Sequence, residues 1–357
     1  MSVSRWGWNP YFEAMWREGN TDNAVPARVV SQQRKFWRVV GEFGDCLAEA
    51  SGKLRLAADE GADWPAVGDW VSLEPQEGNT TAMIRAVLPR RSRFIRKSPG
   101  KRIEEQVIAA NVDTALMVSA LDDDFNPRRV ERYLAQCWES GARPVLILNK
   151  ADACQDSRGQ LAEIERMVIG APVCAISAKT GEGMDKIEPF LVAGQTLVLL
   201  GSSGVGKSTL ANRLLGQSLQ KVSDVRAGDS RGQHTTTVRK LFALPGGALL
   251  IDTPGLRELQ LWDAEDGVAQ AFTDIDLLAA QCRFGDCGHK SEPGCAVQLA
   301  LSAGTLDLAR LENHRKLMRE QAFLRRKMDP EARSEEKRRI RRLTNEGREI
   351  YRQKKPL

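Results

Sequence analysis

The residue types best suited to chemistry lie in one glycine-rich segment, residues 201–208, which reads Gly-Ser-Ser-Gly-Val-Gly-Lys-Ser. This pattern, G-x-x-x-x-G-K-S, is a P-loop, in which glycines let backbone N–H groups turn inward and surround phosphates. We predict that Lys207 contacts the β- and γ-phosphates of a nucleotide and that Ser208 binds Mg²⁺. The predicted phosphate-binding residues are Gly201, Ser202, Ser203, Gly204, Val205, Gly206, Lys207, Ser208 and Thr209.

The elements that flank this loop are those that the motif requires. Residues 195–200 are apolar and predict a buried strand, and residues 209–215 have the spacing of a helix. A P-loop binds phosphate where it joins a strand to a helix, so the context supports the motif over a chance glycine-rich turn.

A second motif predicts which base accompanies the phosphates. Residues 143–152 read as an apolar strand that ends in Asn149-Lys150-Ala151-Asp152, the pattern N-K-x-D. The Asp152 carboxylate can accept from N1–H and the 2-amino group of guanine, whereas adenine offers neither donor. The Lys150 stem can lie along the base, and Asn149 can tie this loop to the P-loop. Alone the motif has little weight, since Asn and Lys at a strand end commonly form a turn.

A short predicted strand, residues 172–176, follows this motif at a helix-length interval and leads into Ser177-Ala178-Lys179. We expect the backbone N–H of Ala178 to meet the O6 atom of guanine. The two segments together predict a guanine nucleotide.

Two loops after the P-loop contain groups that could sense the γ-phosphate. Residues 247–255 form an apolar strand that ends in Asp252-Thr-Pro-Gly255. We predict that Asp252 holds Mg²⁺ through water and that the Gly255 N–H contacts the γ-phosphate. Residues 232–237 form a polar loop, in which one of three threonines could complete the Mg²⁺ shell.

One position in this region bears on hydrolysis. Leu256 stands where Ras-type enzymes have a glutamine that orients the attacking water. A leucine cannot hydrogen-bond water, so we expect slow intrinsic hydrolysis or another positioning group. His234, beside the threonines, is the candidate catalytic residue; the alternative is an exposed histidine without a catalytic role.

The charge of the chain is unevenly distributed. The 357 residues have room for two or three domains and carry a net charge of +5. Residues 315–357 hold 16 Lys and Arg against seven Asp and Glu, so the rest is net negative. This concentration predicts a nucleic-acid-contacting tail. The seven cysteines argue against a secreted disulfide scaffold, and we see neither a membrane span nor a signal peptide, so we expect a cytoplasmic protein.

Residues 25–104 are expected to form an all-β domain. Five strand-length runs separated by turns fit a small closed barrel, either an OB-fold or an SH3-like barrel. The aromatic residues of an N-terminal extension, residues 1–24, either pack on this domain or form a partner-binding arm. A basic strip in residues 88–102 is interpreted as phosphate-contacting, with a solvated linker as the alternative. Its members are Arg90, Arg91, Arg93, Arg96, Lys97, Lys101 and Arg102.

Four potential metal ligands cluster late in the chain, in the pattern C-x4-C-x-H-x5-C: Cys282, Cys287, His289 and Cys295. Three thiolates and one imidazole predict a closed tetrahedral Zn²⁺ site, one ion per chain, which is structural because no position is left open. Reduced cysteines packed in a small loop are the alternative.

After this cluster we expect a helix that Thr305 caps and that runs to Lys327. Its apolar side should contain Leu308, Leu311, Met318 and Leu324. Residues 331–352 are rich in Arg, Lys and Glu with little apolar face, and are expected to contact RNA or to form a solvated helix.

The order of the motifs is unusual. An ordinary GTPase runs P-loop, switch threonine, D-x-x-G, N-K-x-D and S-A-K, whereas here the last two come first. The same sheet can form if the chain is cut and rejoined elsewhere, because domain termini usually lie near each other. With its flanking domains, the chain resembles the circularly permuted GTPases of the ribosome small-subunit-dependent GTPase A family, over roughly residues 25–330.

The resemblance implies a multidomain protein: an N-terminal extension (1–24), an all-β OB-fold barrel (25–104), an α/β permuted P-loop GTPase domain (105–265), and a small zinc-binding domain with a basic helical tail (266–357). It also implies a GTP hydrolase, using Mg²⁺ with GTP, that binds the small ribosomal subunit and its rRNA. The subunit would stimulate hydrolysis, and the enzyme would assist late subunit maturation; we expect a monomer.

Chain order and residue types leave two further points open. The region after D-T-P-G leads directly into the C-terminal domain, so nucleotide-dependent changes there could move that domain. The alternatives are an RNA-binding scaffold with a structural nucleotide and a GTPase that acts on another RNA, such as transfer RNA.

Overall fold

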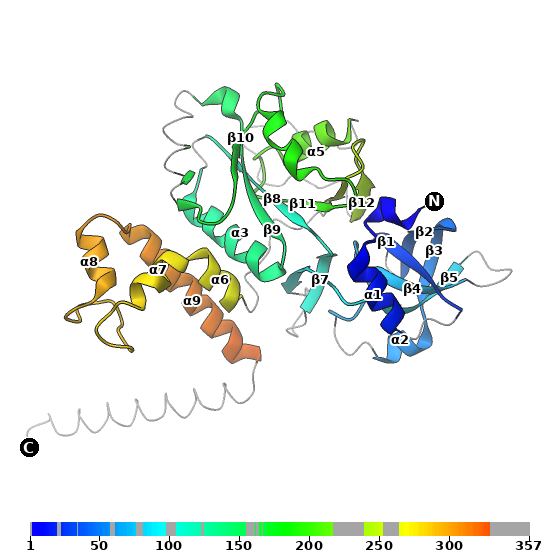
Figure 1. The fold of residues 1–357 in the computed structure, drawn as a ribbon, viewed down its shortest axis with the longest axis horizontal. Helices are drawn as coiled ribbons and strands as arrows, with labels where there is room; N and C mark the ends of the chain where they lie inside the picture. The colour runs from blue at the N-terminus through cyan, green and yellow to red at the C-terminus, as the bar shows by residue number, and fades with distance from the viewer. Residues whose placement is uncertain are drawn as a thin grey trace, which may run out of the picture. The chain divides into compact units, whose positions relative to one another are not determined.

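The chain divides into two compact units (Figure 1). Unit 1 comprises Met1–Gln260 and Asp266–Leu277, and unit 2 comprises Leu261–Glu265 and Leu278–Leu357. The predicted domain boundaries at residues 24 and 104 fall inside unit 1 and stay predictions. The computed structural model describes residues 2–19, 23–33, 35–57, 61–75, 81–97, 105–122, 125–154, 161, 164–165, 167–216, 239–252 and 264–328.

Five strands of unit 1 close into a barrel: β1 (Val25–Gln33), β2 (Phe36–Gly41), β3 (Gly44–Ala50), β4 (Trp70–Glu74) and β5 (Thr81–Val87). The order is β1-β2-β3-β5-β4, with β4 pairing back to β1 and β3 parallel to β5. The short helix α2 (Gly52–Ala57) lies between β3 and β4 in the chain. Trp37 and Val39 alternate into the barrel core while Phe36 faces outward. The barrel is OB-like, which confirms the expected class over the SH3-like alternative.

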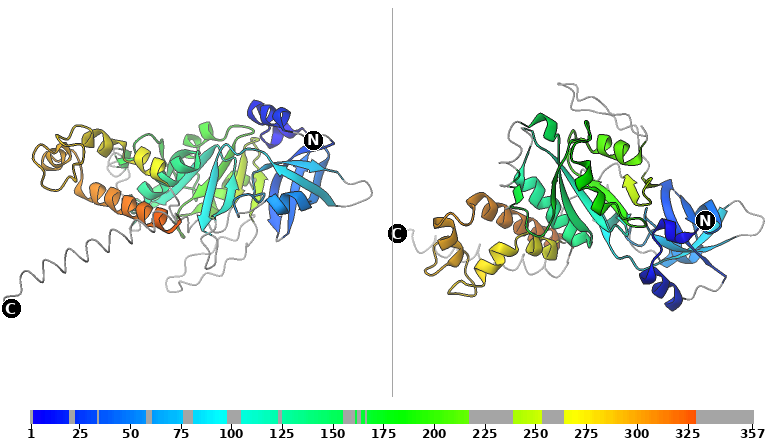
Figure 2. Two further views of the ribbon diagram at one scale, coloured as in Figure 1. Left: turned by 90° about the horizontal axis from the view of Figure 1, so that it is seen from below. Right: turned by 45° about the horizontal axis from the view of Figure 1, so that its top comes forward.

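The N-terminal segment packs on this barrel through aromatic side chains, which is the first of the two alternatives that the sequence left open. It forms η1 (Val3–Trp6) and α1 (Pro10–Glu18), which Asn9 caps by accepting from the N–H of Tyr11. Phe12 is buried against Trp70 of β4, and the Trp8 ring meets Trp70 edge-on at 4.7 Å. Figure 2 shows α1 beside the barrel in both views.

The second part of unit 1 is a mostly parallel sheet. Its parallel strands are β8 (Thr114–Ala120), β9 (Arg143–Asn149), β10 (Val173–Ala175), β11 (Thr196–Leu200) and β13 (Leu249–Asp252). They run in the order β10-β9-β8-β11-β13, and β12 (Lys240–Ala243) is antiparallel at the end of this row. Their nearly continuous apolar sequences suit strands that are covered on both faces. A single pairing, Ser31 with Lys240, joins β12 to β1 of the barrel.

Helices α5 and α3 cover this sheet. α5 (Lys207–Leu215) packs Leu210 with Leu116 of β8, whereas Val130 of α3 (Pro127–Ser140) lines a small cavity with Met117. Neighbouring strand residues point to opposite faces, so the two helices lie on opposite sides. The remaining elements of unit 1 include β6 (Arg93–Lys97), which pairs with β7 (Glu105–Ala110), and the 3-10 helices η2 (Ala151–Ala153), η3 (Met184–Lys186) and η4 (Glu188–Phe190).

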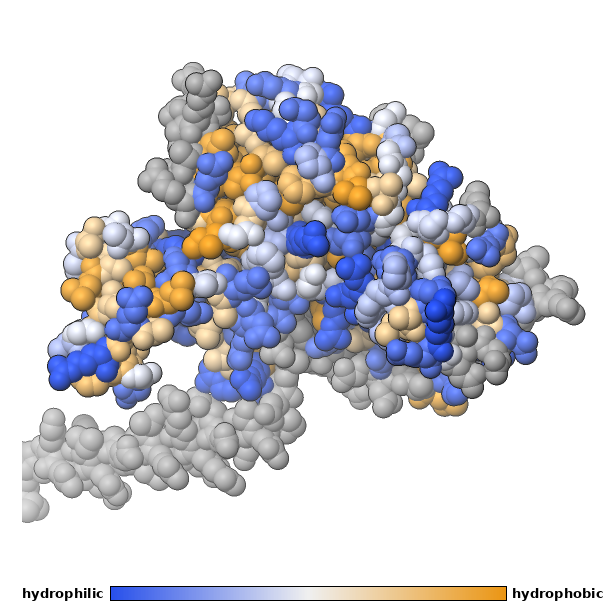
Figure 3. Space-filling model, in the orientation of Figure 1, coloured by the Kyte–Doolittle hydropathy of each residue, from blue (hydrophilic) through white to orange (hydrophobic). Residues whose placement is uncertain are grey.

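Unit 2 is built around a loop over residues 282–295 and two helices, α8 (Ala296–Ser302) and α9 (Leu308–Met328). α6 (Glu265–Ala271) and α7 (Thr273–Ala279) belong mostly to unit 1. The surface of unit 2 exposes apolar side chains such as Phe284 and Leu299, and Figure 3 shows apolar surface at the α8 end. No described helix is long and apolar enough to cross a membrane.

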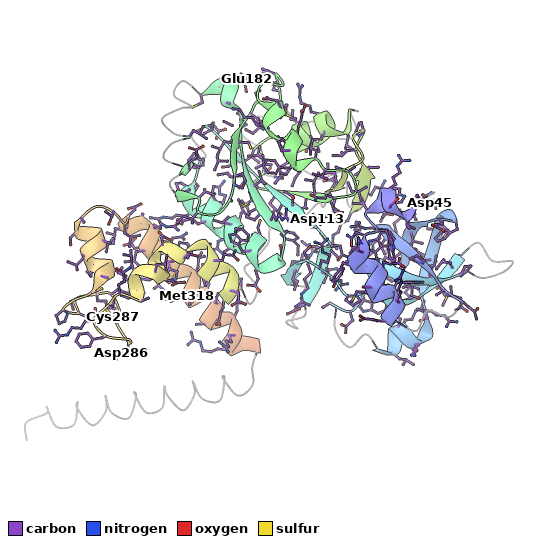
Figure 4. The ribbon with its side chains drawn as sticks, in the orientation of Figure 1. Asp45, Asp113, Glu182, Asp286, Cys287 and Met318 are labelled. Carbon is purple, nitrogen blue, oxygen red and sulfur yellow. The ribbon has the colours of Figure 1, made fainter. Side chains whose placement is uncertain are left out.

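Two predictions about α9 are wrong. Asp307, not Thr305, caps the helix, since its Oδ1 accepts from the N–H of Ala309 at 3.0 Å; the Thr305 hydroxyl instead donates to a carbonyl of α8. Leu308 is 55% exposed and Met318, labelled in Figure 4, is 41% exposed, although Leu311 is buried as expected. The buried stripe also contains polar residues, which the apolar spacing could not reveal: Arg310, Asn313 and Gln321.

The interpretation of Arg90 as part of a phosphate-contacting strip is also wrong. Its guanidinium donates to both carboxylate oxygens of Asp69, at 2.8 and 2.7 Å, and to two carbonyl oxygens of the loop before β4. Asp69 is fully buried and also accepts from the N–H of Ala66. Arg90 therefore ties the segment after β5 to the loop before β4. Arg91 is exposed in part and pairs with Asp113 at 3.3 Å.

This contrast predicts the effect of removing Arg90. Arg90→Ala leaves the buried Asp69 carboxylate without its cation and should lower the free energy of unfolding by about 3 kcal/mol. Arg85→Ala is the matched control, because it breaks an exposed ion pair with Glu74 on the same barrel and should leave the denaturation midpoint unchanged. Urea denaturation measures both variants. Equal losses of unfolding free energy in the two variants would contradict a structural role specific to Arg90.

Candidate nucleotide site and metal centre

The P-loop joins β11 to α5, the strand and helix that the sequence predicts. Gly201, Gly204 and Gly206 all have positive φ, at 143°, 81° and 93°. At Gly206 a Cβ would also collide with the Asn149 amide. Only glycine satisfies both conditions there. The loop conformation therefore depends on the glycines that define the motif.

The Lys207 side chain folds back over the P-loop. Its ammonium donates to the carbonyl oxygen of Gly201 at 2.7 Å and to that of Ser202. The cation is thus held at the mouth of the loop, where phosphate oxygens would be stronger acceptors. Ser208 and Thr209 lie in the first turn of α5, partly exposed.

Arg129 of α3 also contacts the P-loop, and sequence analysis missed it. Its Nη1 donates to the Ser202 hydroxyl at 2.8 Å, across 73 residues of chain. No local pattern marks such a contact, because it depends on how α3 packs beside the loop.

Asn149 links the two loops that the motifs single out. This side chain is 3% exposed; its Nδ2 donates to the P-loop carbonyl of Val205 at 2.8 Å, and its Oδ1 accepts from the N–H of Ala178 at 2.8 Å. The first bond is the tie to the P-loop that we expected. The second changes the expected role of Ala178, whose N–H already has a partner and would have to leave it to meet a base.

The other residues of N-K-x-D lie at the same edge of the sheet. Lys150 has a left-handed backbone, with φ 65°, and its ammonium pairs with Asp122 at 2.7 Å. Asp152 is exposed on η2, and the N–H of Ala151 donates to Ile176 at the end of β10. The pair with Asp122 fixes the direction of the Lys150 stem.

The S-A-K loop is closed by its own hydrogen bonds. Ser177 is fully buried, and its N–H donates to the carbonyl oxygen of Glu182 at 2.9 Å (Figure 4). The Ser177 hydroxyl accepts from the N–H of Thr180 at 3.1 Å. Lys179 is exposed between them.

Asp252 ends β13, which is parallel to β11 with Ile251 opposite Val198. The carboxyl ends of β8, β9, β11 and β13 therefore bring Asp122, Asn149, the P-loop and Asp252 to one edge, where open parallel sheets bind ligands. His234, Gly255, Leu256 and the three threonines lie outside the described residues.

The four predicted zinc ligands converge in unit 2. All their donor atoms lie within 4.8 Å of one another. The Nδ1 atom of His289 is 3.6 Å from the Cys282 sulfur and 3.5 Å from that of Cys295. Cys287 lies in the same loop (Figure 4). Three sulfurs and one imidazole nitrogen fit a tetrahedral zinc ion.

Residues outside the ligand set hold this loop. The Glu292 carboxylate accepts from the N–H groups of Gly288, Lys290 and Ser291. Backbone hydrogen bonds, its own N–H first, lower the pKa of Glu292 to about 2. Arg315 of α9 donates to the carbonyl oxygen of His289 at 2.7 Å, and Gln298 of α8 donates to the same oxygen at 2.5 Å. These contacts support the strained backbone of His289, whose φ is 56°.

Known proteins share this architecture. The family model described as RsgA GTPase matches residues 87–262. The small ribosomal subunit biogenesis GTPase RsgA of Opitutus terrae is 48% identical over 339 residues, which are 92% of each chain. The crystal structure of YjeQ from Thermotoga maritima has a TM-score of 0.63 and 26% identity, over 84% of this chain and 98% of that one.

The structure of YloQ, described as a circularly permuted GTPase, has the same fold. Its TM-score is 0.61 at 22% identity, over 85% of this chain and 96% of that one. The permuted order of the loops on one parallel sheet agrees with this likeness. Since the identity to the curated relative extends over nearly the whole length, the chain belongs to the RsgA GTPase family and is a GTP-hydrolysing enzyme.

Proposed function

We propose that this enzyme is a GTP-driven assembly factor of the small ribosomal subunit. The observation that carries the proposal is the 48% identity, over 92% of both chains, to a relative named for the biogenesis of that subunit. The enzyme acts in the cytoplasm as a monomer, binds the subunit through its rRNA, and assists late maturation. The GTP form docks, and hydrolysis promotes release.

The P-loop binds the phosphates of GTP in this proposal. Its N–H groups and those at the start of α5 surround the β-phosphate, and Lys207 exchanges its carbonyl partners for phosphate oxygens. Ser208 and Asp252 would hold Mg²⁺, the latter through water, and the ion would neutralise charge on the phosphates. Asp252 ends β13, which pairs with β11, and β11 leads through the P-loop to Ser208 in the first turn of α5; this chain path supports the pairing.

The guanine base lies between the two other loops. Asp152 accepts from its N1–H and 2-amino group, and the Lys150 stem, directed by Asp122, covers one face of the base. Asn149 keeps this loop at a fixed distance from the P-loop. The S-A-K loop supplies a backbone N–H to O6.

Hydrolysis depends on groups in the switch loops. His234 positions the water, in place of the glutamine that Leu256 replaces, and contact with the subunit brings it into place. The support for the role of His234 and for its activation by the subunit comes from the sequence alone. The Gly255 N–H senses the γ-phosphate.

The proposed metal in unit 2 is a structural Zn²⁺, bound by Cys282, Cys287, His289 and Cys295. The support is the convergence of all four donors, which leaves no position for a reacting water. Zinc would hold together a loop that has little apolar core.

The proposed activity predicts how GTP turnover responds to the subunit. Purified small subunits should stimulate turnover, and Lys207→Ala should lower kcat/KM by at least about 100-fold with or without them, because a positioned cation on the transferred phosphoryl group is lost. Phosphate release measures both. Arg55→Ala, which removes an exposed barrel arginine paired with Glu49, is the control for unaltered basal turnover. Equal stimulation by transfer RNA would favour the alternative RNA partner.

The base contacts predict a change of specificity. Asp152→Asn replaces an acceptor with an amide that can donate to the 2-keto oxygen of xanthine. It should weaken GDP binding by about tenfold or more and strengthen XDP binding. Calorimetric titration of each nucleotide checks this, with Asp185→Asn, an exposed acid on η3, as the matched variant. Unchanged preference for GDP would remove Asp152 from the base site.

The metal centre predicts the zinc content. The purified chain should contain one zinc ion, released quantitatively by thiol modification and measured with a colorimetric chelator. Cys287→Ser should lose the ion, because three ligands bind zinc far more weakly than four. Cys46→Ser removes a free thiol of the barrel, and this variant should keep the zinc ion. If a protein sample without zinc unfolded unit 2 as cooperatively as the zinc-containing wild type does, the structural role of the metal would be contradicted.

A further inference from the structure

Arg213, near the end of the P-loop helix α5, contacts the S-A-K loop. Its Nε donates to the carbonyl oxygen of Ala178 and its Nη2 to that of Lys179, both at 2.7 Å. The two acceptors belong to successive peptide groups. The helix that begins with Lys207 therefore also holds the loop that faces the base.

The shape of the guanidinium explains why an arginine serves here. Its planar fork presents several N–H donors in a fixed geometry, so one side chain can hold two neighbouring carbonyl groups, which a lysine ammonium cannot do with the same rigidity. Gly181 leaves room for it, since a Cβ there would lie 2.6 Å from Arg213 Nη1. Gly181 also has φ 97°, which side chains rarely adopt.

The contacts of Arg213 fix one peptide N–H in particular. In a trans peptide the C=O and the N–H point in opposite directions, so holding the Ala178 carbonyl also sets the direction of the Lys179 N–H. The N–H groups on either side are engaged: Ala178 donates to Asn149 and Thr180 to Ser177. Among the residues that the structure describes, the Lys179 N–H has no acceptor.

We propose that Arg213 is a positioning residue for guanine recognition. It holds the Ala178–Lys179 peptide so that the Lys179 N–H meets O6 of the base, and it ties this donor to the phosphate-binding helix. The donor differs from the Ala178 N–H that the sequence indicates, because Asn149 occupies that group. The inference rests on the proposed guanine site and deepens it.

Affinity for a nucleotide altered at one atom tests this role. GDP and 6-thio-GDP differ only at position 6, where sulfur is a weaker and larger acceptor than oxygen. The wild type should bind GDP about tenfold more tightly than 6-thio-GDP, which is the size expected for one well-made hydrogen bond. Arg213→Ala should lose most of this preference by weakening GDP binding, with little effect on 6-thio-GDP.

Two further variants separate positioning from general stability. Arg213→Lys keeps the charge, but its preference for GDP over 6-thio-GDP should fall nearly as far as that of Arg213→Ala. Gly181→Ala displaces the guanidinium and should act in the same direction. Arg55→Ala, on the barrel, is the control with wild-type binding. For Arg213→Ala, KM for GTP should rise by about the same tenfold while kcat stays unchanged, because the contacts of Arg213 that the structure describes are with the base-facing loop.

The outcomes distinguish the inference from the proposal on which it rests. An Arg213→Ala variant that keeps the preference for GDP, or that loses affinity for both nucleotides equally, overturns the positioning role. A wild type that binds GDP and 6-thio-GDP equally also overturns it, while its preference for GDP over ADP would still uphold the guanine site. Equal binding of GDP and ADP would overturn the guanine site itself.

Discussion

The fold of unit 1 depends on the burial of one cation, Arg28 of β1, which is 1% exposed. A buried guanidinium is costly unless its N–H groups are paired. Its acceptors are the carbonyl oxygens of Trp6, Gly68 and Asn111 and the hydroxyl of Thr196. Burial lowers the pKa of Arg28 to about 10, against the opposing effect of Asp113 and Asp69, so it stays charged at neutral pH. The N-terminal segment, the barrel and β11 must meet in one arrangement to satisfy it.

The same network reaches the nucleotide site through β11. Asp113 accepts from the N–H of Thr196 at 2.8 Å and pairs with Arg91; Figure 4 shows it where the barrel meets the sheet. Thr196 begins β11, and the strand ends at Leu200, directly before the P-loop. The phosphate-binding loop is therefore anchored at its base by the barrel. A displacement of the barrel can be transmitted to the P-loop through β11 and through the β1–β12 pairing, because both connect the barrel to the parallel sheet.

Sequence predicted the parts of the site that depend on local spacing. The P-loop motif spans eight residues, 201–208, and the predicted zinc ligands lie within fourteen residues, so both patterns are visible in a short window. The roles of Arg28, Arg90 and Arg213 were not predictable, because their acceptors lie between 21 and 168 residues away. Basic residues near one another in the chain looked like one phosphate-contacting strip, yet Arg90 is paired with the buried Asp69 in the loop before β4. Periodicity failed in α9 because polar side chains share its buried stripe.

Circular permutation leaves the sheet intact and changes only what the loops connect. A parallel sheet needs its strands side by side, whatever their order in the chain, and the order β10-β9-β8-β11-β13 satisfies this. In an unpermuted chain the strand before D-x-x-G would lead onward into the sheet. Here β13 ends at Asp252, and the chain next enters the segments that form α6 and unit 2. The D-T-P-G segment, residues 252–255, for which we propose a γ-phosphate contact, therefore precedes α6, α7 and most of unit 2 in the chain. If the proposed γ-phosphate contact of Gly255 changes with the nucleotide, the permuted chain order predicts a response in the segments that follow in sequence, α6 and α7 and then the rest of unit 2.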